Sequence, residues 1–157
     1  MNRPNLHASL QLGAIEVPNR IVMPPMVVWK ATADGTVTEP ILEHYRRSAG
    51  PGMVIVEATV VSPEGRLART QIGAFEDRHV DGLARLAELI HGAGAVASIQ
   101  LHHAGPERFE ARVGRACTTR CRIDRRLGCT EYLLELPVNK APMLVQGLQE
   151  AVPLRIA

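Results

Sequence analysis

Short apolar runs, separated by amphipathic stretches, organise the first hundred residues of the chain. Three runs rich in β-branched residues predict buried strands, at Ile21–Met23, Met53–Ala58 and Val96–Leu101. Two shorter runs flank Gly13 and predict a hairpin between Leu10 and Val17. The pattern therefore begins as a hairpin followed by strands that are buried on both faces.

The stretches between the predicted strands have helical spacing. Thr38 stands at the expected N-cap of one helix, which should end before Gly50. Asp77 is the expected N-cap of a second helix, whose apolar residues recur at steps of three and four up to Gly92. The order strand, helix, strand, helix, strand predicts an α/β fold with parallel strands and right-handed crossovers.

This regular pattern stops near residue 106. Residues 107–130 contain seven arginines and all three cysteines, and show no clean period. Residues 1–106 carry 9 Lys and Arg against 10 Asp and Glu, whereas residues 107–157 carry 9 against 6. A strand near Leu133–Pro137 and a short helix in residues 142–152 are the weaker predictions for this basic tail.

Length and composition limit the classes of protein to consider. The chain has 157 residues, enough for one domain. Apolar residues make up 46% of the sequence and charged residues 22%, a composition that argues against disorder and against a coiled coil. No apolar run approaches the roughly 18 residues of a membrane span, and the start has no signal-peptide pattern. We therefore expect a cytoplasmic protein without a membrane partner. An odd number of cysteines also argues against a disulfide framework.

Candidate binding residues follow the predicted strands, because ligands of parallel α/β proteins collect at the carboxyl ends of the strands. These residues are Pro25, Met26 and Val27 after the first strand, Ala58 at the end of the second and Gln100 in the third. They include no nucleophile with a base and no glycine-rich phosphate loop. A carboxamide beside backbone amides suits a flat ligand with a polar edge.

Structural roles compete with each of these functional readings. Met26 and Val27 could be core residues, and Gln100 could be a hydrogen-bonded polar group at a strand end. We expect Glu57 to be a paired structural carboxylate without a role in proton transfer.

Metal and nucleic-acid sites are not predicted. His102 and His103 are adjacent on a strand and should point to opposite sides. Cys117, Cys121 and Cys129 are three thiols without a fourth ligand. The arginine-rich stretch has almost no interleaved aromatic residues, so we expect no nucleic-acid partner.

Three blocks of sequence stand out: NRIVMPPM (residues 19–26), DGTVTEPILEHYRRSAGPGMVIVEATVVSPEGR (34–66) and SIQLHHAG (98–105). Together they resemble the old yellow enzyme family of FMN-dependent NADH:flavin oxidoreductases. The resemblance covers residues 8–106 and implies a (β/α)8 barrel with FMN as cofactor and NADH or NADPH as reductant. It also implies hydride transfer by way of the flavin to an activated alkene or a similar small-molecule substrate.

The resemblance assigns a place to each candidate residue. It implies that Pro25, Met26 and Val27 lie against the flavin, that Ala58 meets the ring through its backbone, and that Gln100 lies at its pyrimidine edge. Many relatives have Thr or Cys at the Val27 position. Because valine cannot donate that hydrogen bond, we expect an altered flavin potential.

The resemblance covers only part of a barrel. A complete (β/α)8 barrel needs about 250 residues, so we expect about its first three β/α units, preceded by the hairpin. We predict an amino-terminal barrel segment at residues 1–106 and a divergent tail at 107–157, for which we hypothesise out-of-frame coding. The chain alone should show little or no turnover. The alternatives are an unstable non-catalytic fragment or a protein that pairs its open edge strand with another chain, and homo-oligomerisation stays open.

Overall fold

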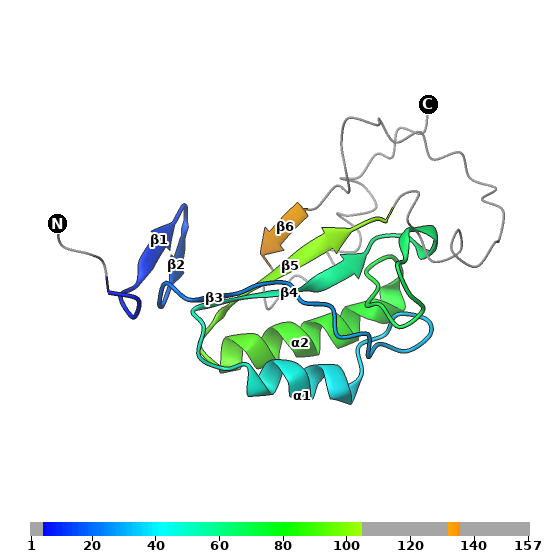
Figure 1. Cartoon of the computed structure of the whole chain (residues 1–157), viewed down its shortest axis with the longest axis horizontal. Helices are drawn as coiled ribbons and strands as arrows, with labels where there is room; N and C mark the ends of the chain where they lie inside the picture. The colour runs from blue at the N-terminus through cyan, green and yellow to red at the C-terminus, as the bar shows by residue number, and fades with distance from the viewer. Residues whose placement is uncertain (1–4, 105–131, 136–157) are drawn as a thin grey trace, which may run out of the picture.

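A small antiparallel hairpin precedes the main body of the chain. The computed structural model describes residues 5–104 and the backbone of residues 132–135. Strands β1 (Leu10–Leu12) and β2 (Ile15–Val17) pair antiparallel around Gly13, whose φ of 61° is the left-handed conformation that glycine adopts readily. The hairpin extends from one end of the molecule (Figure 1). The predicted hairpin is confirmed.

The main body is a sheet with the strand order β3-β4-β5-β6. Strands β3 (Val22–Met23), β4 (Met53–Val60) and β5 (Val96–His102) are parallel, as the sequence pattern predicts. The strand β6 (Tyr132–Glu135) pairs antiparallel with β5, which differs from the all-parallel order of a (β/α)8 barrel. The described chain is thus a parallel three-stranded unit with one added antiparallel strand.

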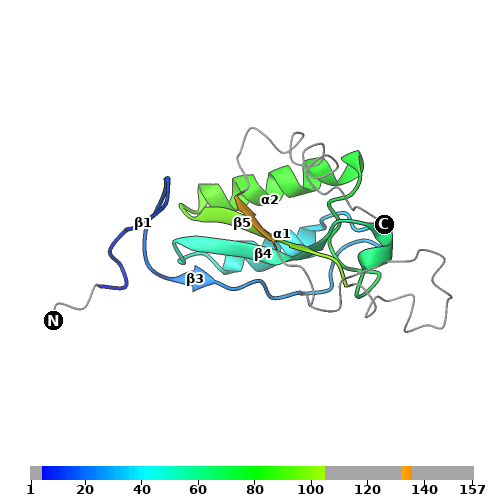
Figure 2. The same ribbon diagram turned by 90° about the horizontal axis from the view of Figure 1, so that it is seen from above.

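Two helices cover one face of this sheet. Helix α1 (Glu39–Arg47) connects β3 to β4, and helix α2 (Val80–Gly92) connects β4 to β5 (Figures 1 and 2). Among the described residues, neither helix is long and apolar enough to cross a membrane. Each helix follows a strand and returns the chain to the start of the next one, which is the β/α connection expected from the sequence.

The beginnings of both helices differ in detail from the sequence prediction. Thr38 is the N-cap residue of α1, but its side chain makes no cap bond, because its hydroxyl donates to the Lys30 carbonyl at 2.6 Å. Asp77 is not the N-cap residue of α2. It opens a single 3-10 turn, Asp77–His79, which Glu76 caps, and the α-helix starts at Val80.

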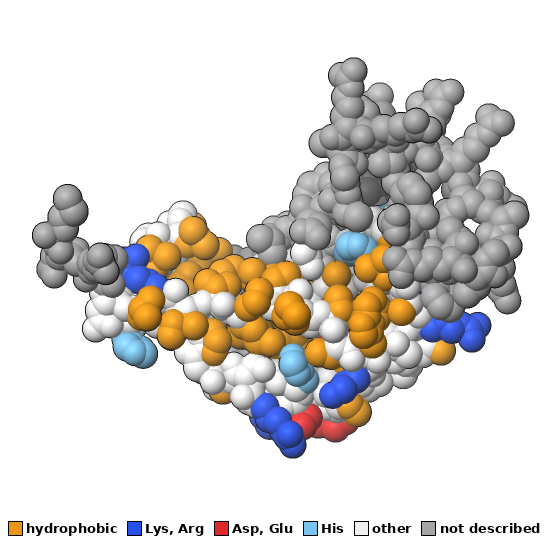
Figure 3. All heavy atoms as spheres, viewed as in Figure 1, with side chains coloured by type: hydrophobic (Ala, Val, Ile, Leu, Met, Phe, Trp, Pro, Cys, Tyr) orange, Lys and Arg blue, Asp and Glu red, His pale blue; other side chains and the backbone are white. Residues whose placement is uncertain are grey.

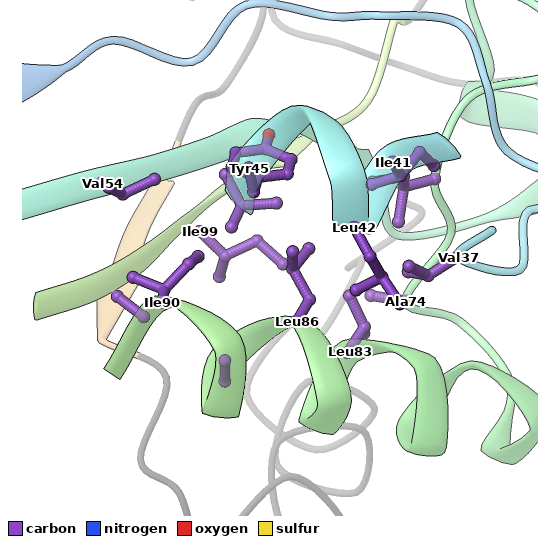
Figure 4. Packing of buried hydrophobic residues seen from close by; sticks show 14 of the residues in the cluster. Val37, Ile41, Leu42, Tyr45, Val54, Ala74, Leu83, Leu86, Ile90 and Ile99 are labelled. Carbon is purple, nitrogen blue, oxygen red and sulfur yellow. The ribbon is translucent and has the colours of Figure 1, made fainter. Parts of the chain in front are cut away.

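The core lies between the helices and the sheet. Leu83, Leu86 and Ile90 of α2 pack towards Leu42 of α1 and Ile99 of β5 (Figure 4). The strand residues that alternate towards the helices are Val54, Val56, Ala97, Ile99 and Leu101. Burial of these side chains fixes which face each strand presents to the helices.

Large apolar side chains remain exposed along β3 and the segments on either side of it. They include Ile21, Val22, Met26 and Trp29, with exposed fractions of 38% to 62%. Figure 3 shows apolar side chains gathered across the middle of the face seen in Figure 1. Among the described residues β3 is the outer strand of the sheet and pairs only with β4. The sheet therefore has an open apolar edge in this part of the chain.

Candidate ligand site at the carboxyl ends of the parallel strands

Strands β3, β4 and β5 run in the same direction, and β3 ends opposite Val54. The chain after β3 continues towards the carboxyl half of β4, where the Val28 N–H donates to the Glu57 carboxylate. The segments that leave these strands gather at the same end of the molecule (Figure 1). Pro25, Met26 and Val27 follow β3, while Ala58 and Gln100 lie in the carboxyl halves of β4 and β5. The five predicted residues thus share one edge.

A bulge in β4 brings Ala58 beside Gln100. Val56 pairs with Ile99 and Thr59 pairs with Leu101, so two residues of β4, Glu57 and Ala58, stand opposite the single residue Gln100 of β5. Such a bulge bends the strand and redirects its backbone groups and side chains. Gln100 is partly exposed, whereas Ala58 is buried.

Hydrogen bonds from α1, from the segment after β4 and from β4 itself hold this bulge. The Glu57 N–H donates to the Tyr45 hydroxyl at 2.8 Å, and that hydroxyl points away from α2 (Figure 4). The Gln71 side chain donates to the Ala58 carbonyl at 2.9 Å. The Thr59 hydroxyl donates to the Glu57 carbonyl at 2.8 Å. The backbone that faces Gln100 is therefore fixed by α1 and by the segment after β4.

Gln71 also fixes the long segment that follows β4. Its side-chain oxygen accepts the Leu67 N–H at 2.8 Å, and its amide nitrogen lies 3.4 Å from Nδ1 of His102. Gln71 is fully buried, so these contacts satisfy a polar group that would otherwise be costly to bury. Tyr45 and Gln71 support the site and were not singled out from the sequence. Tyr45 resembles a core residue of α1, and no local pattern marks Gln71.

The segment after β3 is only partly buried. Met26 has an exposed fraction of 62%, and Pro25 and Val27 are half-buried. The reading of Met26 as a core residue therefore does not hold within the described residues. Trp29, two residues past Val27, has an exposed fraction of 43% and a φ of 55°, which is unusual for a bulky side chain.

Glu57 connects the bulge to the segment after β3. Its side chain is fully buried, and Oε2 accepts the Val28 N–H at 3.0 Å. Within the described residues Oε1 has no hydrogen-bond partner, and none of the ion pairs there includes Glu57. The expectation of a paired carboxylate is therefore wrong for this part of the chain. Burial raises the pKa of Glu57 to about 7, while the bond from Val28 lowers it.

Metal binding receives no support from the described residues. No group of three His, Cys, Asp or Glu side chains in them could hold a metal ion. The three cysteines and the arginine-rich stretch lie outside the residues that the structure describes.

The model of the NADH:flavin oxidoreductase / NADH oxidase family matches residues 5–128, past the boundary expected at residue 106. An NADPH dehydrogenase of Halalkalibacterium halodurans is 42% identical over 103 residues, which are 64% of this chain and 30% of that protein.

Two solved structures share the fold. The old yellow enzyme from Trypanosoma cruzi matches with a TM-score of 0.63 at 30% identity, over 73% of this chain and 31% of that one. Morphinone reductase in complex with tetrahydroNAD matches with a TM-score of 0.66 at 26% identity, over 92% and 44%. The chain thus spans less than half the length of these relatives. It belongs to the NADH:flavin oxidoreductase / NADH oxidase family and corresponds to the amino-terminal part of its members.

Proposed function

We propose that the segment after β3 and the carboxyl ends of β4 and β5 bind the isoalloxazine ring of FMN, as part of an oxidoreductase that uses NADH or NADPH. The family is one of FMN-dependent oxidoreductases with these reductants. The observation that carries the proposal is the bulge, which sets Gln100 opposite Ala58 at the shared strand edge. We also propose that the chain contains about the first three β/α units of a (β/α)8 barrel, and that this barrel segment ends at residue 106.

The chemistry of the edge fits a flavin ring. The pyrimidine edge of the ring alternates carbonyl acceptors with an N–H donor, and the Gln100 carboxamide offers both an acceptor and donors. Gln71 already engages the Ala58 carbonyl, so the backbone beside the ring is held in one position. Met26 is exposed at this edge and could cover a ring face with its thioether.

The chain's own residues would bind and orient the cofactor. When bound, FMN supplies hydride transfer between the nicotinamide and an acceptor. Gln100 would hold the pyrimidine edge, and Pro25 to Val27 would limit access of water to the ring. We propose an electron-poor small molecule, such as an activated alkene, as the acceptor. This chain spans about a third of the relatives' length, so we expect little turnover from it alone.

Absorbance and titration with FMN test the proposal. The purified chain is expected to bind FMN, with flavin absorbance that bleaches on addition of NADPH. Gln100→Leu should weaken FMN binding roughly 10-fold, because the pyrimidine edge loses its hydrogen bonds. Gln11→Leu is the matched control, since Gln11 lies in the hairpin and bonds the nearby Gly13 carbonyl. A colourless protein that associates through its open β3 edge would instead support the edge-pairing alternative.

Val27 provides a second measurement. Val27→Thr adds a hydroxyl at a position that the resemblance sets against the flavin. A donor there stabilises the negative charge of the reduced ring, so the midpoint potential should rise by roughly 30 mV, equivalent to one charge-assisted hydrogen bond. A potentiometric titration measures this, with Val27→Ala as the control that adds no donor. Equal potentials in all three proteins would place residue 27 away from the ring.

A further inference from the structure

Among the described residues, Glu57 links the bulge in β4 to the segment between β3 and α1. Its backbone belongs to the bulge beside Ala58, while its carboxylate accepts the N–H of Val28. Val28 stands between Val27 and Trp29 in the chain. A change at this carboxyl group would therefore reach the residues proposed to contact the flavin without any direct contact between Glu57 and the ligand.

The backbone next to this bond is strained. Trp29 has a φ of 55°, in the left-handed region that a bulky residue rarely adopts. Such a conformation persists only where neighbouring contacts hold it. The Val28–Glu57 bond is one of these contacts. A second is the Thr38 hydroxyl, which donates to the Lys30 carbonyl on the other side of Trp29.

The surroundings of the Glu57 carboxyl group also favour a change of its charge near neutral pH. It is fully buried, and Oε1 has no hydrogen-bond partner among the described residues. Burial disfavours the ionised form and raises the pKa of Glu57 to about 7. An ionised carboxylate accepts an N–H more strongly than a protonated one, so the Val28 bond weakens on protonation.

We propose that Glu57 is a positioning residue whose ionised carboxylate holds the Met26–Trp29 segment in its strained conformation, and that protonation of Glu57 releases the segment. The consequence for FMN rests on the proposed function. The segment presents Met26 and Val27 to the ring only while the Val28 bond is intact.

Other titratable groups lie on the elements around Glu57. Tyr45 of α1 accepts the Glu57 N–H, and burial raises the pKa of its hydroxyl above the usual range. His44 contacts the Tyr45 ring edge-on from the same helix. Lys30 follows Trp29 in the segment, and His102 of β5 lies 3.4 Å from Gln71. A test must separate the effect of Glu57 from any effect of the two histidines, because histidine is the usual side chain behind pH-dependent changes near neutrality.

Trp29 provides a direct signal, because it is the only tryptophan of the chain. In the protein without ligand, its fluorescence emission is expected to change with pH, with a midpoint at about 7. Glu57→Gln keeps the shape of the side chain without ionising and should abolish the transition. His102→Gln, His44→Gln and the exposed Glu88→Gln should retain it. An unchanged transition in Glu57→Gln, or none in the unmodified chain, would overturn the proposal.

Titration with FMN gives the second readout. The unmodified chain is expected to bind FMN roughly threefold to tenfold more weakly at pH 5.5 than at pH 8, and Glu57→Gln should lose this dependence. If FMN does not bind while the Trp29 transition depends on Glu57, the proposed function fails and the control of the segment stands. FMN binding with an identical pH profile in both proteins would reject the role of Glu57 and leave the proposed function intact.

Discussion

The free energy of unfolding is expected to fall by about 3 kcal/mol as the pH rises from 4.5 to above 7, through the ionisation of Glu57 alone. The ordinary pKa of 4.5 applies to the unfolded chain, and burial raises the folded value to about 7. Between these values the folded protein binds more protons than the unfolded one. This contribution is therefore fully present below pH 4.5 and is lost as the pH rises through 7.

Urea unfolding at a series of pH values measures this effect. Glu57→Gln removes the ionisable group, so its stability relative to the unmodified chain should be similar at pH 4.5 and greater by about 3 kcal/mol above pH 7. Glu88→Gln changes an exposed carboxylate of α2 and controls for the general effect of charge. If the difference between Glu57→Gln and the unmodified chain is the same at every pH, Glu57 ionises equally in both states.

The ionised form of Glu57 that the proposed role requires is also the form that lowers the stability of the folded protein. A glutamine at this position would give a more stable protein near neutral pH, yet it would hold the Val28 N–H less strongly. Groups that destabilise the folded state are common where a ligand site needs a particular geometry. The buried carboxylate is therefore better explained by the site than by the fold.

The strands and helices could be predicted because their patterns are local. Strands buried on both faces, such as Met53–Val60, require a continuous apolar run, and α2 shows its buried face at steps of three and four residues. Helix starts depend on competing partners. The Thr38 hydroxyl donates to the Lys30 carbonyl, eight residues earlier and outside the helix, and the sequence pattern of the helix start does not predict this partner.

The site could be predicted only in part, for a related reason. The strand-end rule and the family resemblance selected Ala58 and Gln100, and parallel pairing brings the two together. Their alignment depends on a register shift in β4, which has no local sequence pattern. Its supports, Tyr45 and Gln71, come from other elements, and the Glu57 carboxyl was expected to have an ionic partner that the described residues do not provide.

Gly52→Ala is expected to destabilise the fold by roughly 2 to 3 kcal/mol, because no space exists for a side chain at this position. A Cβ on Gly52 would lie 2.5 Å from the backbone carbonyl oxygen of Asn19 and 2.6 Å from the backbone nitrogen of Asn19. The backbone at Asn19 would therefore have to move. The Asn19 side chain accepts the N–H groups of Ile21 and Gly52 at 3.0 and 2.7 Å and donates to Gly50 at 3.0 Å.

These bonds fix the start of β3, which has only two residues and leads directly into Pro25 to Val27. Displacing Asn19 should therefore weaken FMN binding in addition to lowering stability, and urea unfolding with an FMN titration measures both effects. Gly92→Ala is the matched control, since nothing lies within 4 Å of its added Cβ, and alanine in a helix should increase stability by up to about 1 kcal/mol. Equal unfolding curves for the two variants would show that the Asn19 contact does not hold β3, and the edge strand would then depend on its pairing with β4 alone.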